Sequence, residues 1–85
     1  MKEITYTITD PQGIHARPAG VLTKKAKEFA CSVTMKKDDK TADAKKMFAV
    51  MGLAVKNGET VTFTLEGEDE EQAAVALEQM LKENL

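Results

Sequence analysis

The chain has few of the residues that form disulfides or metal sites. Its 85 residues include one cysteine, Cys31, and one histidine, His15. A single thiol excludes an intrachain disulfide and fits a reducing compartment. No second cysteine or histidine stands at a spacing typical of a zinc site, so we expect no bound metal. The nucleotide-binding pattern GxxxxGK[ST] is absent as well, and nothing in the sequence indicates a cofactor.

Long hydrophobic runs and a strong excess of one charge are also missing. No apolar stretch approaches the length that spans a membrane, and no basic segment followed by an apolar one marks a secretion signal. The formal net charge of −2 is too small to indicate a nucleic-acid-binding protein. With 42% hydrophobic and 31% charged residues, the composition is typical of a folded globular domain. We therefore expect one cytoplasmic domain, residues 1–85, without membrane insertion.

Three segments alternate apolar and polar side chains, which is typical of strands with one buried face. Their apolar positions are Ile4, Tyr6 and Ile8; Cys31, Val33 and Met35; and Val61, Phe63 and Leu65. A further short strand is expected around residues 41–43, after the polar stretch 36–40. Turn residues fill 10–13 (Asp-Pro-Gln-Gly) and 57–58 (Asn-Gly).

Helical periodicity occupies the segments between these strands. Apolar residues three or four apart predict helices over 16–29, 46–54 and the segment after Asp69. The predicted inward positions are Ala19, Leu22, Ala26 and Phe29; Val50 and Leu53; and Ala73, Leu77, Met80 and Leu81. Asp69 and Gln72 resemble a capping box for the last helix. The order βαββαβα predicts an α+β open-faced β-sandwich, a four-stranded antiparallel sheet with three helices on one face.

Residues 13–19, Gly-Ile-His-Ala-Arg-Pro-Ala, contain the candidate chemistry. Pro18 suits a first helical turn, which places the helix start near Ala16 and His15 at the N-cap. The free backbone N–H groups of that turn and the helix dipole form an anion site. The same positive potential disfavours a charged imidazole, so His15 keeps a lone pair that can attack phosphorus. Arg17 and the amides of Ala16 and Arg17 can then hold the phosphoryl group. An ordinary capping or surface histidine is the alternative.

These residues resemble the HPr family, the histidine-containing phosphocarriers of the bacterial phosphoenolpyruvate-dependent sugar phosphotransferase system. The similarity extends over the whole chain and includes residues 47–53 (MFAVMGL), which are similar to the family's short second helix. The resemblance implies that phosphorylated enzyme I phosphorylates His15 at Nδ1, that Arg17 supports the phosphoryl group, and that enzyme II A domains accept it. It also implies a monomer that acts as a stoichiometric carrier and not as an enzyme.

One position departs from the family pattern. Many Gram-positive members carry a regulatory serine just before the second helix, and Lys46, preceded by Lys45, occupies that place. Because lysine has no hydroxyl, we expect control by serine phosphorylation to be absent. Lysine also cannot accept a backbone N–H as a helix cap, so Asp43 is a candidate cap for an earlier helix start.

We expect a partner-docking surface on the first two helices. Its candidate residues are Gly20, Lys24, Lys27, Met47, Phe48 and Met51. The three apolar side chains are predicted to form a patch beside His15, with packing into the core as the alternative. The lysines can steer acidic partners, although they also complement the negative end of the first helix.

Two other functions stay open at this point. A regulatory relative, from the nitrogen-related or dihydroxyacetone-kinase-linked branch of the family, would use the same phosphohistidine to report phosphorylation state. A non-catalytic protein-binding module would keep the fold and lose the phosphorylatable histidine. His15 and Arg17 are both present, which argues against this last reading.

Overall fold

The computed structural model describes residues 1–85, and its seven elements follow the predicted order βαββαβα. The strands are β1 (Lys2–Thr7), β2 (Ser32–Lys37), β3 (Lys40–Asp43) and β4 (Thr60–Glu66). The helices are α1 (Ala16–Lys27), α2 (Met47–Gly52) and α3 (Glu70–Asn84). No helix combines the length and apolar composition that crossing a bilayer requires.

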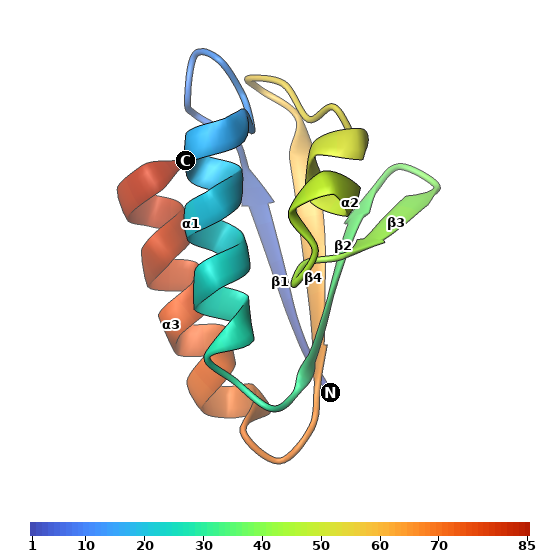
Figure 1. Cartoon of the computed structure of the whole chain (residues 1–85), viewed down its shortest axis with the longest axis vertical. Coiled ribbons are helices and arrows are strands. Elements are labelled where there is room, and N and C mark those ends of the chain that lie inside the picture. The colour runs from blue at the N-terminus through green and yellow to red at the C-terminus, as the bar shows by residue number, and fades with distance from the viewer.

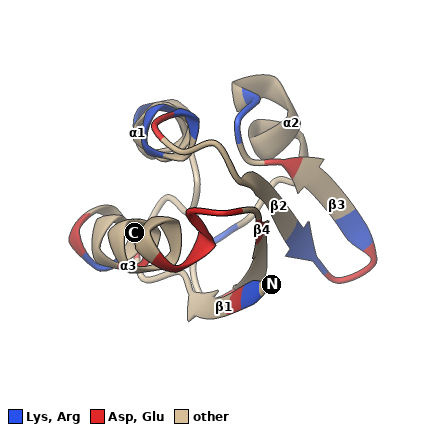
Figure 2. Ribbon diagram, turned by 90° about the horizontal axis from the view of Figure 1, so that it is seen from below, with Lys and Arg blue, Asp and Glu red and all other residues tan.

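The four strands form one antiparallel sheet in the order β1-β4-β2-β3. The last strand, β4, therefore lies between β1 and β2, and Phe63 at its centre is opposite Ile4 on one side and Met35 on the other. All three helices cover the same face of this sheet (Figure 2). The predicted open-faced sandwich is confirmed.

The alternating positions of the strands meet the apolar faces of the helices in one cluster of 22 buried hydrophobic residues. Every predicted inward residue of the three helices is buried except Phe29, which is half-buried just beyond the end of α1. Burial of this apolar surface is the main stabilising term for a domain of this size. The periodicity arguments are thus confirmed at the level of the core.

The second helix does not begin early, so the prediction that Asp43 caps it is wrong. The carboxylate of Asp43 accepts the N–H of Lys45 at 2.9 Å, and its carbonyl accepts the N–H of Lys46 at 3.0 Å. These bonds form a turn before the helix, and α2 starts at Met47 with Lys46 as a cap residue that makes no side-chain capping bond. The helix ends ahead of Ala54, whose φ of 51° places it in the left-handed region.

The capping box predicted for α3 is also wrong, although Asp69 does occupy the N-cap position. Its carboxylate accepts the N–H groups of Ala30 at 2.8 Å and Cys31 at 2.9 Å, across the molecule in the α1–β2 connection. The hydrogen bond from Ala30, with that from Cys31, holds the pKa of Asp69 below its usual value. Burial raises the pKa of the Cys31 thiol, so this side chain stays protonated and packs as a core residue.

The loop before α1, the loop before β4 and the C-terminus meet at one end of the sandwich (Figure 1). Backbone N–H groups of Thr9 and Asp10 donate to the carbonyl of Leu85, and the N–H of Gly58 donates to Ile8. These bonds hold the loop before α1 between the chain terminus and the loop before β4. The loop before α1 carries His15.

Candidate functional site

The loop that leads into α1 is fixed by backbone geometry. The carbonyl of Asp10 accepts the N–H of Gly13 at 2.9 Å, which closes the predicted turn. Gly13 has a φ of 69° and is buried, and the next N–H, of Ile14, donates to the carbonyl of Val55 at 3.0 Å. The buried side chain of Ile14 anchors the residue before the histidine. His15 therefore leaves the loop from a defined position.

His15 is the N-cap residue of α1, as predicted. Its backbone is extended, with φ −106° and ψ −172°, and its ring makes no capping hydrogen bond. The carbonyl of His15 accepts the first helical bond, from Ala19 at 3.0 Å. With a side chain 37% exposed, the imidazole is accessible to a partner and still packed on one side.

The first turn of α1 is open to an anion. The N–H groups of Ala16 and Arg17 donate to no group of the protein, and Pro18 has no N–H. Free amides at a helix N-terminus attract negative charge because the helix dipole adds to their partial positive charges. The first turn of α1, next to His15, therefore has two backbone donors free to bind an anion.

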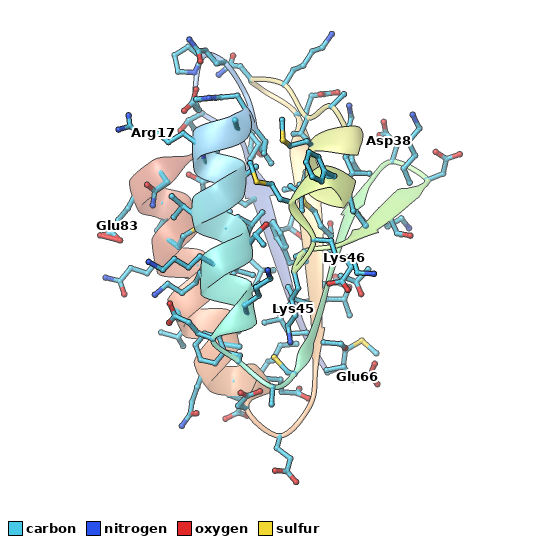
Figure 3. All side chains as sticks on the ribbon, in the orientation of Figure 1. Arg17, Asp38, Lys45, Lys46, Glu66 and Glu83 are labelled. Carbon is cyan, nitrogen blue, oxygen red and sulfur yellow. The ribbon has the colours of Figure 1, made fainter.

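Arg17 extends outward from this turn on the side of α3 (Figure 3). Its guanidinium is exposed and has no ion-pair partner in the structure, and its five donors remain available. An open pocket of about 480 Å³ joins the end of α3 to this turn. The pocket is lined by Asp10, His15, Arg17, Pro18, Val21, Glu83 and Asn84.

Asp10 is the site residue that the sequence reasoning missed, because it was assigned to the turn alone. One oxygen of its carboxylate, Oδ2, lies 3.6 Å from Nε2 of His15. The available signal was a carboxylate five residues before the only histidine, on the far side of a Pro-Gln-Gly turn that folds the chain back. A turn of this kind brings its first residue, here Asp10, close to the segment that follows the turn, which contains His15.

Most of the predicted docking residues surround a second hollow, a groove of about 660 Å³ between α1 and the start of α2. The groove is lined by Gly20, Thr23, Lys24, Lys27, Lys45, Lys46, Met47, Phe48 and Ala49. Phe48 is 87% exposed, whereas Met47 is half-buried. Met51 is also half-buried and lines neither this groove nor the pocket at His15.

The groove has polar groups that the protein itself does not use. Lys24, Lys27 and Lys46 are exposed and form no ion pair, while Lys45 donates to the carbonyl of Phe29 at 2.8 Å. Thr23 is 6% exposed, and its hydroxyl has no hydrogen-bond partner. Thr23 was not among the predicted residues, since a threonine in a helix carries no signal of its own. No group of three or more His, Cys, Asp or Glu side chains gathers as metal ligands.

Comparison with known proteins gives a consistent result across nearly the whole chain. Residues 2–83 match the family model described as "PTS HPr component phosphorylation site". The phosphocarrier protein HPr of Lysinibacillus sphaericus is 47% identical over 83 residues, which are 98% of this chain and 94% of that protein.

Solved structures agree with the sequence comparison. A crystal structure of HPr-C-His from Thermoanaerobacter tengcongensis has a TM-score of 0.94 at 37% identity, covering 99% of this chain and 94% of the other. A crystal structure of an HPr dimer from the same organism has a TM-score of 0.78 at 37% identity, covering 98% and 95%. The chain therefore belongs to the HPr family of phosphocarrier proteins of the bacterial phosphotransferase system.

Proposed function

We propose that this chain accepts a phosphoryl group on His15 from phosphorylated enzyme I and donates it to enzyme II A domains. The observation that carries the proposal is the half-exposed imidazole of His15 at the open N-terminus of α1, beside the free amides of Ala16 and Arg17. Membership of the HPr family supports the same role.

The transfer needs no group beyond those at this end of α1. The lone pair of Nδ1 attacks phosphorus, and the bond between phosphorus and the donor breaks with its electron pair left on the donor. The phosphoryl group then lies against the amides of Ala16 and Arg17, which offset its negative charge. The guanidinium of Arg17 is free to turn toward the phosphoryl oxygens and pair with two of them. Donation to an acceptor reverses these steps.

We also propose that partners dock on the groove between α1 and α2. An aromatic side chain as exposed as Phe48 is unusual in a folded domain and typical of an interface anchor. The unpaired Lys24, Lys27 and Lys46 supply positive charge around it, which favours partners with acidic surfaces. Met51 would contribute from the flank of α2.

The test is phosphorylation by enzyme I with Mg²⁺ and phosphoenolpyruvate, followed by mass analysis under alkaline conditions that preserve phosphohistidine. We expect one phosphate on His15 and none on a His15→Ala variant. A wild-type protein that stays unmodified would reject the proposal. Complementation of sugar uptake in a carrier-deficient strain then separates a transport carrier from a regulatory relative, which should fail to restore uptake.

We further propose that the carrier works as a monomer in the cytoplasm. At least two relatives have been crystallised as dimers, so light scattering of the purified protein at several concentrations is the direct check. A stable dimer at micromolar concentration would reject the monomer.

A further inference from the structure

We infer that Asp10 is a positioning residue for His15: its carboxylate holds the hydrogen of the neutral imidazole on Nε2 and so leaves the lone pair on Nδ1. The inference rests on the proposed function only for its consequence in phosphoryl transfer. The juxtaposition itself is that of Asp10 Oδ2 and His15 Nε2, which lie 3.6 Å apart.

Asp10 is held in place by its own backbone and side chain. Its N–H donates to the carbonyl of Leu85 at 3.0 Å, and its carbonyl accepts the N–H of Gly13 at 2.9 Å. Its Oδ1 accepts the N–H of Gln12 at 2.8 Å. With three of its polar atoms fixed, the fourth, Oδ2, is directed to the ring. The side chain is 22% exposed, so water competes weakly for it.

A neutral imidazole carries one hydrogen, and its location decides which nitrogen is nucleophilic. The tautomer of a histidine is set by the hydrogen bond that the other nitrogen makes, often to a carboxylate. An acceptor beside Nε2 favours the hydrogen there. The present separation is longer than a hydrogen bond, and contacts of this kind often shorten when a reacting partner binds. A small rotation of the half-exposed ring would bring Nε2 within hydrogen-bond distance of Oδ2.

The same carboxylate also serves the phosphorylated state. When Nδ1 of a neutral ring forms its bond to phosphorus, the hydrogen stays on Nε2 and the ring gains a positive charge. Asp10 then pairs with that charge through the N–H of Nε2, or accepts the proton. The phosphoryl group is held by the amides of Ala16 and Arg17, so the two nitrogens of the ring have separate partners.

Asp10 has the only carboxylate within ion-pair distance of the ring. Glu83 supplies the other carboxylate of the same pocket, but it forms no ion pair with His15. The backbone carbonyl of Leu85 is occupied by N–H groups of Thr9 and Asp10. Glu83 therefore offers a matched control: a carboxylate in the same pocket, without the contact.

The test compares tautomers in the unphosphorylated protein by long-range ¹H–¹⁵N correlation spectra, at a pH where the ring is neutral. In the wild type we expect the Nε2–H form to predominate. Asp10→Asn keeps an oxygen for the N–H of Gln12 and can put an amide donor in place of Oδ2. The ratio of Nε2–H to Nδ1–H should then fall about 10-fold, because a negatively charged acceptor facing Nε2 is replaced by a neutral donor. Glu83→Gln should leave the ratio unchanged.

The transfer consequence is measured on the same proteins. The rate of phosphoryl acceptance from enzyme I should fall about 10-fold in Asp10→Asn, and Asp10→Glu should recover part of it. Asp10→Ser, which keeps a side-chain acceptor for the turn, replaces the asparagine variant if that one does not fold. If Asp10→Asn or Asp10→Ser folds and its tautomer ratio equals that of the wild type, the inference is overturned. A wild type that shows the expected tautomer and takes no phosphate would reject the proposed function alone.

Discussion

The Cα of Gly13 lies against the carbonyl oxygen of Val55, so close that a Cβ added to Gly13 would come within 2.3 Å of that oxygen. The contact joins the loop that carries His15 to the loop that follows α2. It also explains the residue type, because the close approach excludes a side chain and the φ of 69° favours glycine. The position of the histidine thus depends on a backbone contact between segments about 40 residues apart.

Gly13→Ala should destabilise the fold, because the methyl group forces the two loops apart in addition to the strained φ. We expect a loss of at least about 1–3 kcal/mol in the free energy of unfolding, measured by urea denaturation. Gly20→Ala is the matched control. Gly20 lies within α1 with nothing within 4 Å of an added Cβ, so this change should stabilise the protein by about 0.5–1 kcal/mol. Equal effects of the two changes would show that the contact with Val55 is unimportant.

The carboxylate of Asp69 should stabilise the fold only in its ionised form. Hydrogen bonds from Ala30 and Cys31 lower its pKa in the folded state, so the stabilisation is present above the unfolded pKa of about 3.9 and is lost as the pH falls through the folded pKa. Asp69→Asn should therefore lower the melting temperature at pH 7, and the difference from wild type should shrink below pH 4.

Glu68→Gln is the control for this pH series, because Glu68 is exposed and has no ion-pair partner. We expect its melting curve to follow the wild type at every pH. A difference between Asp69→Asn and wild type that stays constant from pH 7 to pH 3 would contradict the role given to ionised Asp69.

Phe48→Ala should weaken binding to enzyme I with little change in stability. The ring is exposed in the free protein, so its removal should change the free energy of unfolding by less than about 0.5 kcal/mol. As an interface anchor it should contribute about 1–2 kcal/mol to binding, measured by calorimetry. Val75→Ala, at a 70% exposed position on α3, should affect neither quantity. A large loss of stability with unchanged binding would instead show that Phe48 stabilises the fold and does not contact the partner.

Lys46→Ser should stabilise the protein through α2. Lys46 occupies the N-cap with extended backbone, φ −118° and ψ 112°, and makes no capping bond. A serine there can accept a hydrogen bond from a free N–H of the first turn. We expect the free energy of unfolding of Lys46→Ser to exceed that of Lys46→Ala by about 0.5–2 kcal/mol, because the alanine variant removes the same charge without adding an acceptor. Thermal unfolding of the two variants measures the difference, and equal stabilities would mean that the cap position is not limiting.

The strands and helices were predictable from the sequence because the spacing of apolar residues within each segment shows which face is buried. Val61, Phe63 and Leu65 alternate in the sequence and are buried in β4, and the apolar face of α3 was equally clear. His15 at the N-cap followed from Pro18, whose ring restricts where a helix can begin. In each case the local pattern and the tertiary structure favour the same conformation.

The errors concern carboxylates, whose partners are not fixed by local sequence. Asp69 was predicted to bond within its own helix and instead binds the N–H of Ala30, 39 residues away along the chain. Asp43 stabilises a turn and not the start of α2. Asp10 reaches His15 only because the chain folds back at Gly13. A short polar side chain bonds to whichever free donor the fold brings near, and that information lies in tertiary contacts.

The central claim is that the open first turn of α1 holds a phosphoryl group transferred to His15. The most direct measurement is the ¹H–¹⁵N amide spectrum before and after phosphorylation by enzyme I. We predict large downfield proton shifts at the amides of Ala16 and Arg17, with small changes elsewhere in α1. Phosphate bound to His15 without a shift at either amide, or phosphate bound at another residue, would contradict the account.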